Sequence, residues 1–304
     1  MLAPLIDRSR VSAVLALALG LVVAALLPLG LVLAGAVAAF VALRKGITEG
    51  LLVSAAGLIL LAVMTAAAGY PPGNGMLLPA AFLGAALMSA WTLDTGRSLT
   101  LSVWTMAALA LLALLLFWLA VDSPEQFWRA LFDEVVQAAA ESGQSDMAAQ
   151  LGAMAEALQW RGVTGQFFGS LFLLLTLSLF WGRSWQARLV NPDGFRQEFQ
   201  ALTLGRPLAL GSAAAFMLAA ALGLDLPLSI AAVLLYVWLV PAFALIHWLV
   251  ARAGLGTAWL WAAYVLCVLT WGGNNMLFLL FPLAAMLNEY LDFRRRGSSE
   301  AGGE

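Results

Sequence analysis

Charge is the scarcest property of this sequence. Only 11% of its 304 residues are charged, whereas soluble domains carry about 25%. Apolar residues make up 63% of the chain and give a mean hydropathy of +0.93. This composition excludes an ordinary soluble domain and predicts an integral membrane protein. Long basic runs are also missing, so no nucleic-acid partner is expected.

Cysteine and histidine are almost absent, which excludes most metal and redox chemistry. The single cysteine, Cys267, cannot form a disulfide within the chain and is expected to be a buried apolar filler. With His247 it makes only one distant pair of possible zinc ligands. The sequence motifs of metalloproteases, α/β-hydrolases and phosphate-binding loops are missing too. We therefore predict a protein that is not an enzyme and needs no cofactor or metal.

Long apolar runs, separated by polar residues or by glycine and proline, occupy most of the chain. A bilayer core about 30 Å thick needs about 20 helical residues. Eight to ten spans are expected, because Pro28 could be a kink within one hairpin and the run 208–223 could stop short or re-enter. The fold class is therefore all-α, a polytopic transmembrane helix bundle. The ten candidate runs are 11–27, 28–43, 47–69, 76–92, 99–121, 163–181, 208–223, 226–250, 256–271 and 275–291.

Basic residues are distributed unevenly between the two sides of this bundle. If the N-terminus is inside the cell, only Arg129 and Arg161 of the 15 basic residues fall outside. Short cytoplasmic loops carry an excess of lysine and arginine. We therefore predict a multi-pass protein of the bacterial inner membrane, with the lipid bilayer as its partner and both termini in the cytoplasm.

The same scheme divides the chain into four segments. Residues 1–121 hold the N-terminal transmembrane helices, and residues 122–162 form an external amphipathic helical insert. Residues 163–296 hold the C-terminal transmembrane helices together with the cytoplasmic loop 182–207. Residues 297–304 are expected to form a disordered tail.

The external insert is acidic and has the pattern of two amphipathic helices. Ser123-Pro124 is typical of a helix start, and Ser142-Gly143 breaks the pattern before a second helix that Ser145 can cap. Two roles stay open: the helices could lie along the outer membrane surface, or they could form a lid over an outward-facing cavity. The apolar positions are Phe127, Leu131 and Val135 in the first helix and Met147, Leu151, Met154 and Leu158 in the second.

Polar and aromatic residues gather in two turns at the predicted outer ends of the spans, residues 70–75 and 271–275. Aromatic rings beside amides can hold a small organic ligand by stacking and hydrogen bonding. Tight turns with interfacial aromatic residues produce the same pattern. The candidate ligand-binding residues are Asn74, Trp271, Asn274 and Asn275.

Few ionisable residues lie within the spans, where burying them is costly. Glu49, Asp94, Glu289 and Asp292 sit at predicted cytoplasmic ends, where pairing with nearby basic residues stabilises them. His247 lies near the inner end of its span and is either bonded locally or a proton carrier. No chain of acids crosses the membrane, which argues against a proton relay.

Small residues recur every four positions in the first two apolar runs. Gly20 lies between Ala16 and Ala24, and Ala34 is followed by Ala38. This spacing lets helices approach each other closely. It predicts internal helix packing, with a docking face for a partner as the alternative.

The loop 182–207 is the longest predicted cytoplasmic segment. Asn191-Pro192-Asp193-Gly194 is typical of a turn, and a short helix should run from Phe195 to near Gly205. The helix should lie on the inner membrane surface, with Trp185 near the interface. The candidate interface residues are Arg183, Trp185, Asn191, Phe195, Arg196 and Phe199.

Three stretches of this loop carry a family resemblance. Residues 182–186 read GRSWQ, residues 191–199 read NPDGFRQEF and residues 204–206 read LGR. They resemble the YybS-like family of bacterial multi-pass membrane proteins, which is distantly similar in fold to the substrate-binding S components of energy-coupling-factor transporters. The resemblance implies small-solute capture or transport without an ATPase of its own, with a separate coupling subunit. The alternative is a membrane scaffold or assembly factor that docks a cytoplasmic partner through loop 182–207.

Overall fold

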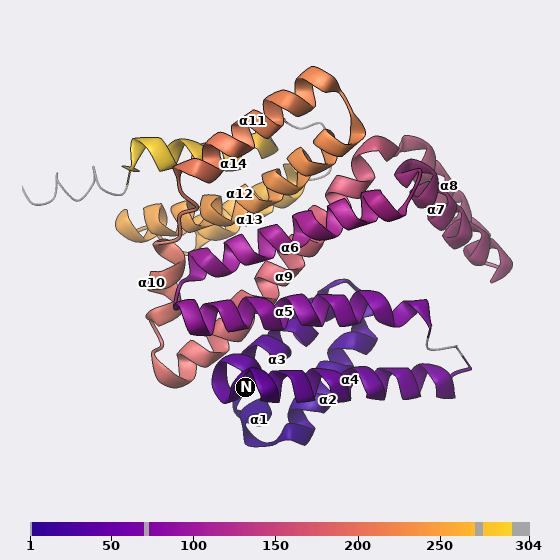
Figure 1. The fold of residues 1–304 in the computed structure, drawn as a ribbon, viewed down its shortest axis with the longest axis horizontal. Helices are drawn as coiled ribbons and strands as arrows, with labels where there is room; N and C mark the ends of the chain where they lie inside the picture. Colours follow the sequence, from indigo (N-terminus) through magenta and orange to yellow (C-terminus); the bar gives the residue numbers. More distant parts are fainter. Residues whose placement is uncertain (1, 70–72, 271–275, 294–304) are drawn as a thin grey trace, which may run out of the picture.

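The structure, a computed structural model, describes residues 2–69, 73–270 and 276–293 (Figure 1). Helices are the regular structure of these residues, so the predicted all-α class is confirmed. The first half contains α1 (Leu2–Arg8), α2 (Arg10–Ala24), α3 (Leu29–Lys45), α4 (Ile47–Ala67), the 3-10 turn η1 (Asn74–Met76), α5 (Leu77–Gly96) and α6 (Leu99–Ala120). The second half contains α7 (Pro124–Glu141), α8 (Ser145–Ala157), α9 (Trp160–Val190), α10 (Gly194–Gln200), α11 (Arg206–Leu222), α12 (Asp225–Arg252), α13 (Ala258–Thr270) and α14 (Met276–Leu291).

Each of the ten apolar runs of the sequence becomes one apolar helix of the bundle. Among the described residues, α4, α5, α6, α9 and α12 are long and apolar enough to cross a membrane, at 20 to 31 residues each. Pro28 is the N-cap of α3, after α2 has ended at Ala24, so it marks a boundary between two helices rather than a kink. The chain is therefore a polytopic helical bundle.

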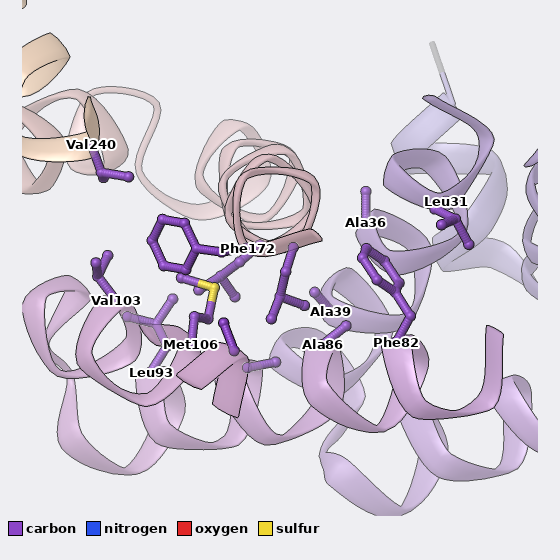
Figure 2. Close-up of a cluster of buried hydrophobic side chains, with 14 of the residues drawn as sticks. Leu31, Ala36, Ala39, Phe82, Ala86, Leu93, Val103, Met106, Phe172 and Val240 are labelled. Atoms are coloured by element: carbon purple, nitrogen blue, oxygen red, sulfur yellow. The ribbon is translucent and has the colours of Figure 1, made fainter. Parts of the chain in front are cut away.

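Helix α3 lies at the centre of the N-terminal half and is buried along almost its whole length. Helices α2, α4, α5 and α9 pack around it. A Cβ added to Gly20 would lie 2.7 Å from the backbone nitrogen of Ala34, and one added to Gly182 would lie 2.8 Å from the carbonyl oxygen of Ala36. The small residues thus let backbones touch, which confirms the prediction of internal packing. Figure 2 shows Ala36 and Ala39 of α3 in this buried cluster.

The helices alternate in direction, so their connections gather at two ends of the bundle (Figure 1). The arginine end carries every described basic residue except Arg129 and Arg161 and holds the starts of α2, α4, α6 and α11. Polar contacts between distant segments hold this end together. They are Arg10 Nε to Glu49 Oε2 at 2.8 Å, Lys45 Nζ to Asp7 O at 2.7 Å, Gln186 Nε2 to Leu43 O at 2.8 Å, Thr100 Oγ1 to Thr203 O at 3.0 Å and Leu204 N to Glu289 Oε1 at 2.9 Å.

These contacts satisfy two of the acids expected to need partners. Glu49 is paired as predicted, although its partner is Arg10 on the neighbouring helix rather than Lys45. Glu289 accepts the backbone N–H of Leu204, and Arg206 donates to the Glu289 carbonyl at 3.0 Å. The acids therefore tie loops to helix ends.

The opposite end, called the insert end, carries α7 and α8. The two helices extend from it as a hairpin, as the sequence pattern predicts (Figure 1). Only Pro124 and Trp128 of α7 are buried, and α8 has no buried residue among those described. At the root of the hairpin, Arg161 Nε donates to Asp225 Oδ1 at 2.5 Å. The hairpin thus contacts the bundle mainly through the first turns of α7.

Candidate functional site

A wedge between α5 and α6 forms the candidate site. The two helices meet at the arginine end, where Arg97 adopts a positive φ of 45° and ends α5. Ser98 then starts α6, its side-chain oxygen accepting the N–H of Leu101 at 3.2 Å. From this tight turn α5 and α6 diverge toward the insert end (Figure 1). Helix α9 packs against both of them, and α7 crosses the wide end of the wedge.

The wedge contains a half-open cavity of about 580 Å³. Pockets for small molecules range from about 300 to 1,000 Å³, so the volume suits a ligand of that class. Every lining side chain is leucine, alanine, phenylalanine or tryptophan. They are Leu77, Leu78, Ala81, Phe82 and Ala85 of α5; Leu109, Ala110, Ala113 and Phe117 of α6; Phe127, Trp128 and Leu131 of α7; and Phe167, Phe168, Leu171, Phe172 and Leu175 of α9.

The cavity has a buried floor and an exposed rim. Phe82, Phe168 and Phe172 of the floor are buried. Below them Thr176 lies beside Met106 (Oγ1 to Sδ, 3.8 Å), and Figure 2 shows Met106 next to Phe172 where the wedge narrows. The rim is exposed, and its residues lie on outward faces of α5, α6 and α7. They are Leu77, Leu78, Ala81, Ala113, Phe127 and Leu131. The cavity therefore opens sideways, toward the region that a bilayer would occupy.

Aromatic packing holds α7 over the wide end. The ring centroid of Phe117 lies 5.3 Å from that of Phe127, 5.6 Å from that of Trp128 and 5.7 Å from that of Phe168. The Trp128 ring also lies 4.9 Å from Phe167. Each such pair contributes about 0.5–1.5 kcal/mol beyond the area it buries. The first turns of α7 therefore cover the wide end of the cavity through packed aromatic side chains.

One buried hydrogen bond complements these rings. Trp128 Nε1 donates to Thr164 Oγ1 at 2.8 Å, joining α7 to α9 across 36 residues of sequence. The bond occupies the only polar side-chain atom among the described residues of the cavity lining, so these residues present ring faces and alkyl groups to the cavity. The cavity can accommodate hydrocarbon, but it offers no side-chain group that would orient a polar solute.

The predicted outer-turn site falls mostly outside the described structure. Trp271, Asn274 and Asn275 are not among the described residues. Asn74 is described as the first residue of η1, and its side chain is not. The proposal that these four residues form a ligand site stays a prediction.

The predicted interface helix is shorter and more deeply packed than expected. Helix α10 ends at Gln200 rather than near Gly205. The rings of Phe195 and Phe199 lie 5.6 and 5.4 Å from Phe180 of α9. Other aromatic rings of the bundle therefore contact the apolar face of α10, and the placement of this helix on the inner membrane surface stays a prediction.

Of the other candidate interface residues, two are held by contacts within the bundle and two are exposed. Trp185 is buried, with its ring 6.0 Å from that of Phe40, so it packs inside the bundle. The Arg183 Nε donates to Glu198 Oε2 at 3.1 Å. Asn191 and Arg196 are exposed. The structure thus brings Arg183, Phe195 and Phe199 together by internal packing and leaves only polar residues of this set on the surface.

His247 and Cys267 have the environments that the local interpretation predicts. His247 Nε2 and the Tyr264 hydroxyl are 2.7 Å apart, and the imidazole packs on Phe199 with ring centroids 5.2 Å apart. Cys267 is buried. Within the described ranges, no group of three or more His, Cys, Asp or Glu side chains is placed to hold a metal ion.

Sequence reasoning missed the wedge because its lining residues lie either within ordinary apolar runs or, for α7, on the apolar face of an amphipathic helix. A weak signal exists on α9, where Phe168 and Phe172 are spaced by one helical turn and Phe167 adjoins them. This spacing marks an aromatic face, but it cannot reveal that the opposing helices diverge. Only the three-dimensional arrangement shows the void.

The fold and the apolar helices define a multi-pass membrane protein. Comparison of the chain with known protein families, curated proteins and solved structures finds no match. Its resemblance to the YybS-like family and to the S components of transporters stays a prediction.

Proposed function

We propose that this multi-pass membrane protein binds a hydrophobic ligand, the hydrocarbon chain of a lipid or isoprenoid, in the wedge between α5, α6 and α9. The observation that carries the proposal is the 580 Å³ cavity lined entirely by apolar and aromatic side chains. Its exposed rim would let a chain enter from the bilayer without passing through water. The ligand is captured rather than chemically changed.

The chemistry of the lining favours a hydrocarbon over the vitamin-like solute that the S-component resemblance implies. A polar solute would lose its water on entry and find no replacement, which costs about 1–3 kcal/mol per unpaired group. A hydrocarbon chain that enters from the bilayer pays no such cost, and packing against the rings and alkyl groups of the lining gives it dispersion contacts. Of the small solutes that the resemblance allows, we therefore propose an apolar molecule as the ligand.

Helix α7 supplies the cover that the lid interpretation of the insert requires. Its residues Phe127, Trp128 and Leu131 line the cavity, and Trp128 is bonded to Thr164 of α9. The remainder of α7 has few contacts with the bundle, so α7 can shift at modest cost. We infer that ligand entry and release involve movement of these first turns.

The positive-inside rule supports an orientation for this site. We propose that the arginine end faces the cytoplasm and that the cavity therefore opens to the outer leaflet. Only Arg129 and Arg161 of the described basic residues lie at the opposite end. A membrane-impermeant maleimide should label Ala149→Cys from outside intact cells and Arg196→Cys only after permeabilisation, each in a Cys267→Ala background. The reverse labelling would contradict this orientation.

The scaffold alternative has less support. The apolar face of α10 is covered by Phe180 and His247, so a partner could reach Asn191 and Arg196 and, of the large apolar side chains of the loop, only Leu189 and Val190 among the described residues. Buried aromatic and arginine side chains carry most of the binding energy of stable interfaces, and the aromatic residues of this loop, Trp185, Phe195 and Phe199, pack inside the bundle. Loop 182–207 therefore has a structural role first, in joining α9, α12 and the start of α11.

A thermal-shift experiment tests the proposed ligand class. Oleic acid and the isoprenoid alcohol farnesol serve as apolar probes, and riboflavin serves as a polar one. The purified, detergent-washed protein should gain melting temperature with an apolar probe, because a ligand that binds only the folded state stabilises it by RT ln(1 + [L]/Kd). Riboflavin should produce no shift.

A matched pair of variants separates cavity binding from general detergent effects. Ala113→Phe places a ring in the cavity, whereas Ala108→Phe adds the same ring to an exposed position of the same helix outside the lining. The probe-induced shift should disappear in Ala113→Phe and persist in Ala108→Phe. Equal shifts in both variants, or a response to riboflavin alone, would overturn the proposal.

A further inference from the structure

The hairpin of α7 and α8 leaves an apolar face uncovered. Phe127, Leu131 and Val135 on α7 are 42%, 44% and 50% exposed, and Met147 and Met154 on α8 are 52% and 58% exposed. Within the described structure α8 packs on α7 and buries no residue. A helix with an apolar stripe is stable only when that stripe packs against something apolar. The hairpin therefore needs a cover from its surroundings.

The exposed positions of the two helices lie on the same side of the hairpin. The half-buried positions Phe132 and Val136 of α7, and Ala148 and Ala155 of α8, mark where the helices contact each other. The exposed positions Leu131, Val135, Met147 and Met154 each precede one of these by a single residue. Because the helices run antiparallel, this one-residue step turns to the same side on both. The hairpin stripe is the continuous face made by Phe127, Leu131, Val135, Met147 and Met154.

The hairpin stripe is continuous with the surface that the bundle turns toward lipid. Phe127 and Leu131 belong both to the stripe and to the rim of the cavity. Leu116 and Leu119, in the last turns of α6, are 56% and 83% exposed and bring the apolar belt of the bundle to the same end. The lipid-facing surface thus runs without a break from α6 past the cavity rim onto the hairpin.

Aromatic residues at the root of the hairpin indicate its depth. The rings of Phe132 and Trp160 lie 5.8 Å apart, and the guanidinium carbon of Arg129 lies 5.0 Å from the Trp160 ring centroid. Trp160 is buried and the Arg129 side chain is half-exposed; a long basic side chain that packs its stem on apolar groups and keeps its charge in water is favoured at the membrane–water interface. The exposed acids Asp133 and Glu156 lie on the sides of their helices opposite the stripe. The hairpin therefore has an apolar side and a hydrated acidic side at the level of the headgroups.

We propose that the α7–α8 hairpin lies along the leaflet next to the insert end, with the hairpin stripe in contact with acyl chains. Its occupant is lipid rather than a protein partner, because the stripe begins at the exposed rim of the cavity and shares Phe127 and Leu131 with it. The acidic opposite side favours a zwitterionic surface over an anionic one. This inference goes beyond ligand binding in the cavity and holds whether or not the cavity is occupied.

Spin labels on the hairpin test this placement. In a Cys267→Ala background, Met154→Cys and Val135→Cys place the label on the stripe, and Ala149→Cys places it on the opposite side of α8. All three positions are exposed, so the substitutions leave the packing of the hairpin intact. The protein is measured in nanodiscs of dioleoylphosphatidylcholine, where oxygen concentrates among acyl chains and a water-soluble nickel chelate does not enter.

We expect the ratio of oxygen to nickel accessibility to be severalfold higher at Met154→Cys and Val135→Cys than at Ala149→Cys. Equal nickel accessibility at all three positions would mean that the stripe faces water, which would overturn the proposal. Labels on the stripe that neither reagent reaches would mean that protein covers it, from a second copy or a partner, and would also overturn it. The cavity variant Ala113→Phe should leave all three ratios unchanged, which separates this test from that of ligand binding.

Discussion

The helices around α3 and the helices that form the wedge both pack through apolar side chains. The first group packs closely, whereas the second leaves a cavity. Around α3, glycine and alanine let the backbones of α2 and α9 approach so closely that a Cβ added to Gly20 or Gly182 would clash with the α3 backbone. In the wedge, large rings on α9 face helices that diverge, and a cavity of about 580 Å³ remains. Where helices cross closely, small side chains are enough to fill the space between them. Where helices diverge, even large side chains leave a cavity. The shape of the crossing, rather than hydrophobicity, decides where a membrane protein can hold a ligand.

The largest expected effect comes from removing a ring on each side of this comparison. Phe40 is fully buried in the packed half, so Phe40→Ala should destabilise the protein by about 3–5 kcal/mol. Phe172 borders an existing void on one side, and Phe172→Ala should cost clearly less, because that side has few contacts to lose. Unfolding in mixed micelles of increasing SDS content measures both. A greater loss of stability for Phe172→Ala than for Phe40→Ala would contradict the view that the wedge is less tightly packed than the region around α3.

Adding one methyl group should produce the next largest effect. Gly182→Ala forces a Cβ to within 2.8 Å of the Ala36 carbonyl and should destabilise the protein by about 1–3 kcal/mol. Gly84→Ala on α5 meets nothing within 4 Å among the described atoms and should be neutral or stabilising by up to about 1 kcal/mol. Thermal melting of the two purified variants gives the comparison. Equal effects would show that the close approach of α9 to α3 is not needed.

The hydrogen bond between α7 and α9 should contribute less to the free energy of unfolding than these packing contacts. Trp128→Phe keeps most of the ring but removes the donor to Thr164, at a cost of about 1 kcal/mol. Trp118→Phe is the matched control, because Trp118 Nε1 is buried and has no partner among the described residues. Hydrogen exchange should rise in residues 124–135 of the first variant only. Unchanged exchange there would mean that the rings alone hold the cover.

The smallest effect is expected at the surface of the insert end. Arg161 and Asp225 form an ion pair whose side chains are 59% and 37% exposed. Arg161→Ala should lower stability by about 0.2–1 kcal/mol, because water and salt screen exposed pairs. Melting at low and high salt tests this, since the difference from the native protein should shrink as salt rises. A loss that exceeds that of Gly182→Ala would show that the root of the hairpin is more rigid than its exposure indicates.

Much of the architecture follows from local patterns, and the wedge does not. The apolar runs predict eight to ten spans because length and hydropathy are properties of single segments. The start of α7 at Pro124 follows from turn chemistry in the same way. The burial of Trp185 and the packing of Phe199 on His247 depend on segments far apart in the chain, and so does the divergence of α5 from α6. No spacing within one segment contains that information.

The most direct test of the central claim is native mass spectrometry of the protein extracted from its own membrane. The account predicts that the native chain and Ala108→Phe retain a bound species with a long hydrocarbon chain after detergent washing, and that Ala113→Phe loses it. Retention of the same species by all three proteins, or by none, would contradict the assignment of the wedge as a binding site for hydrocarbon.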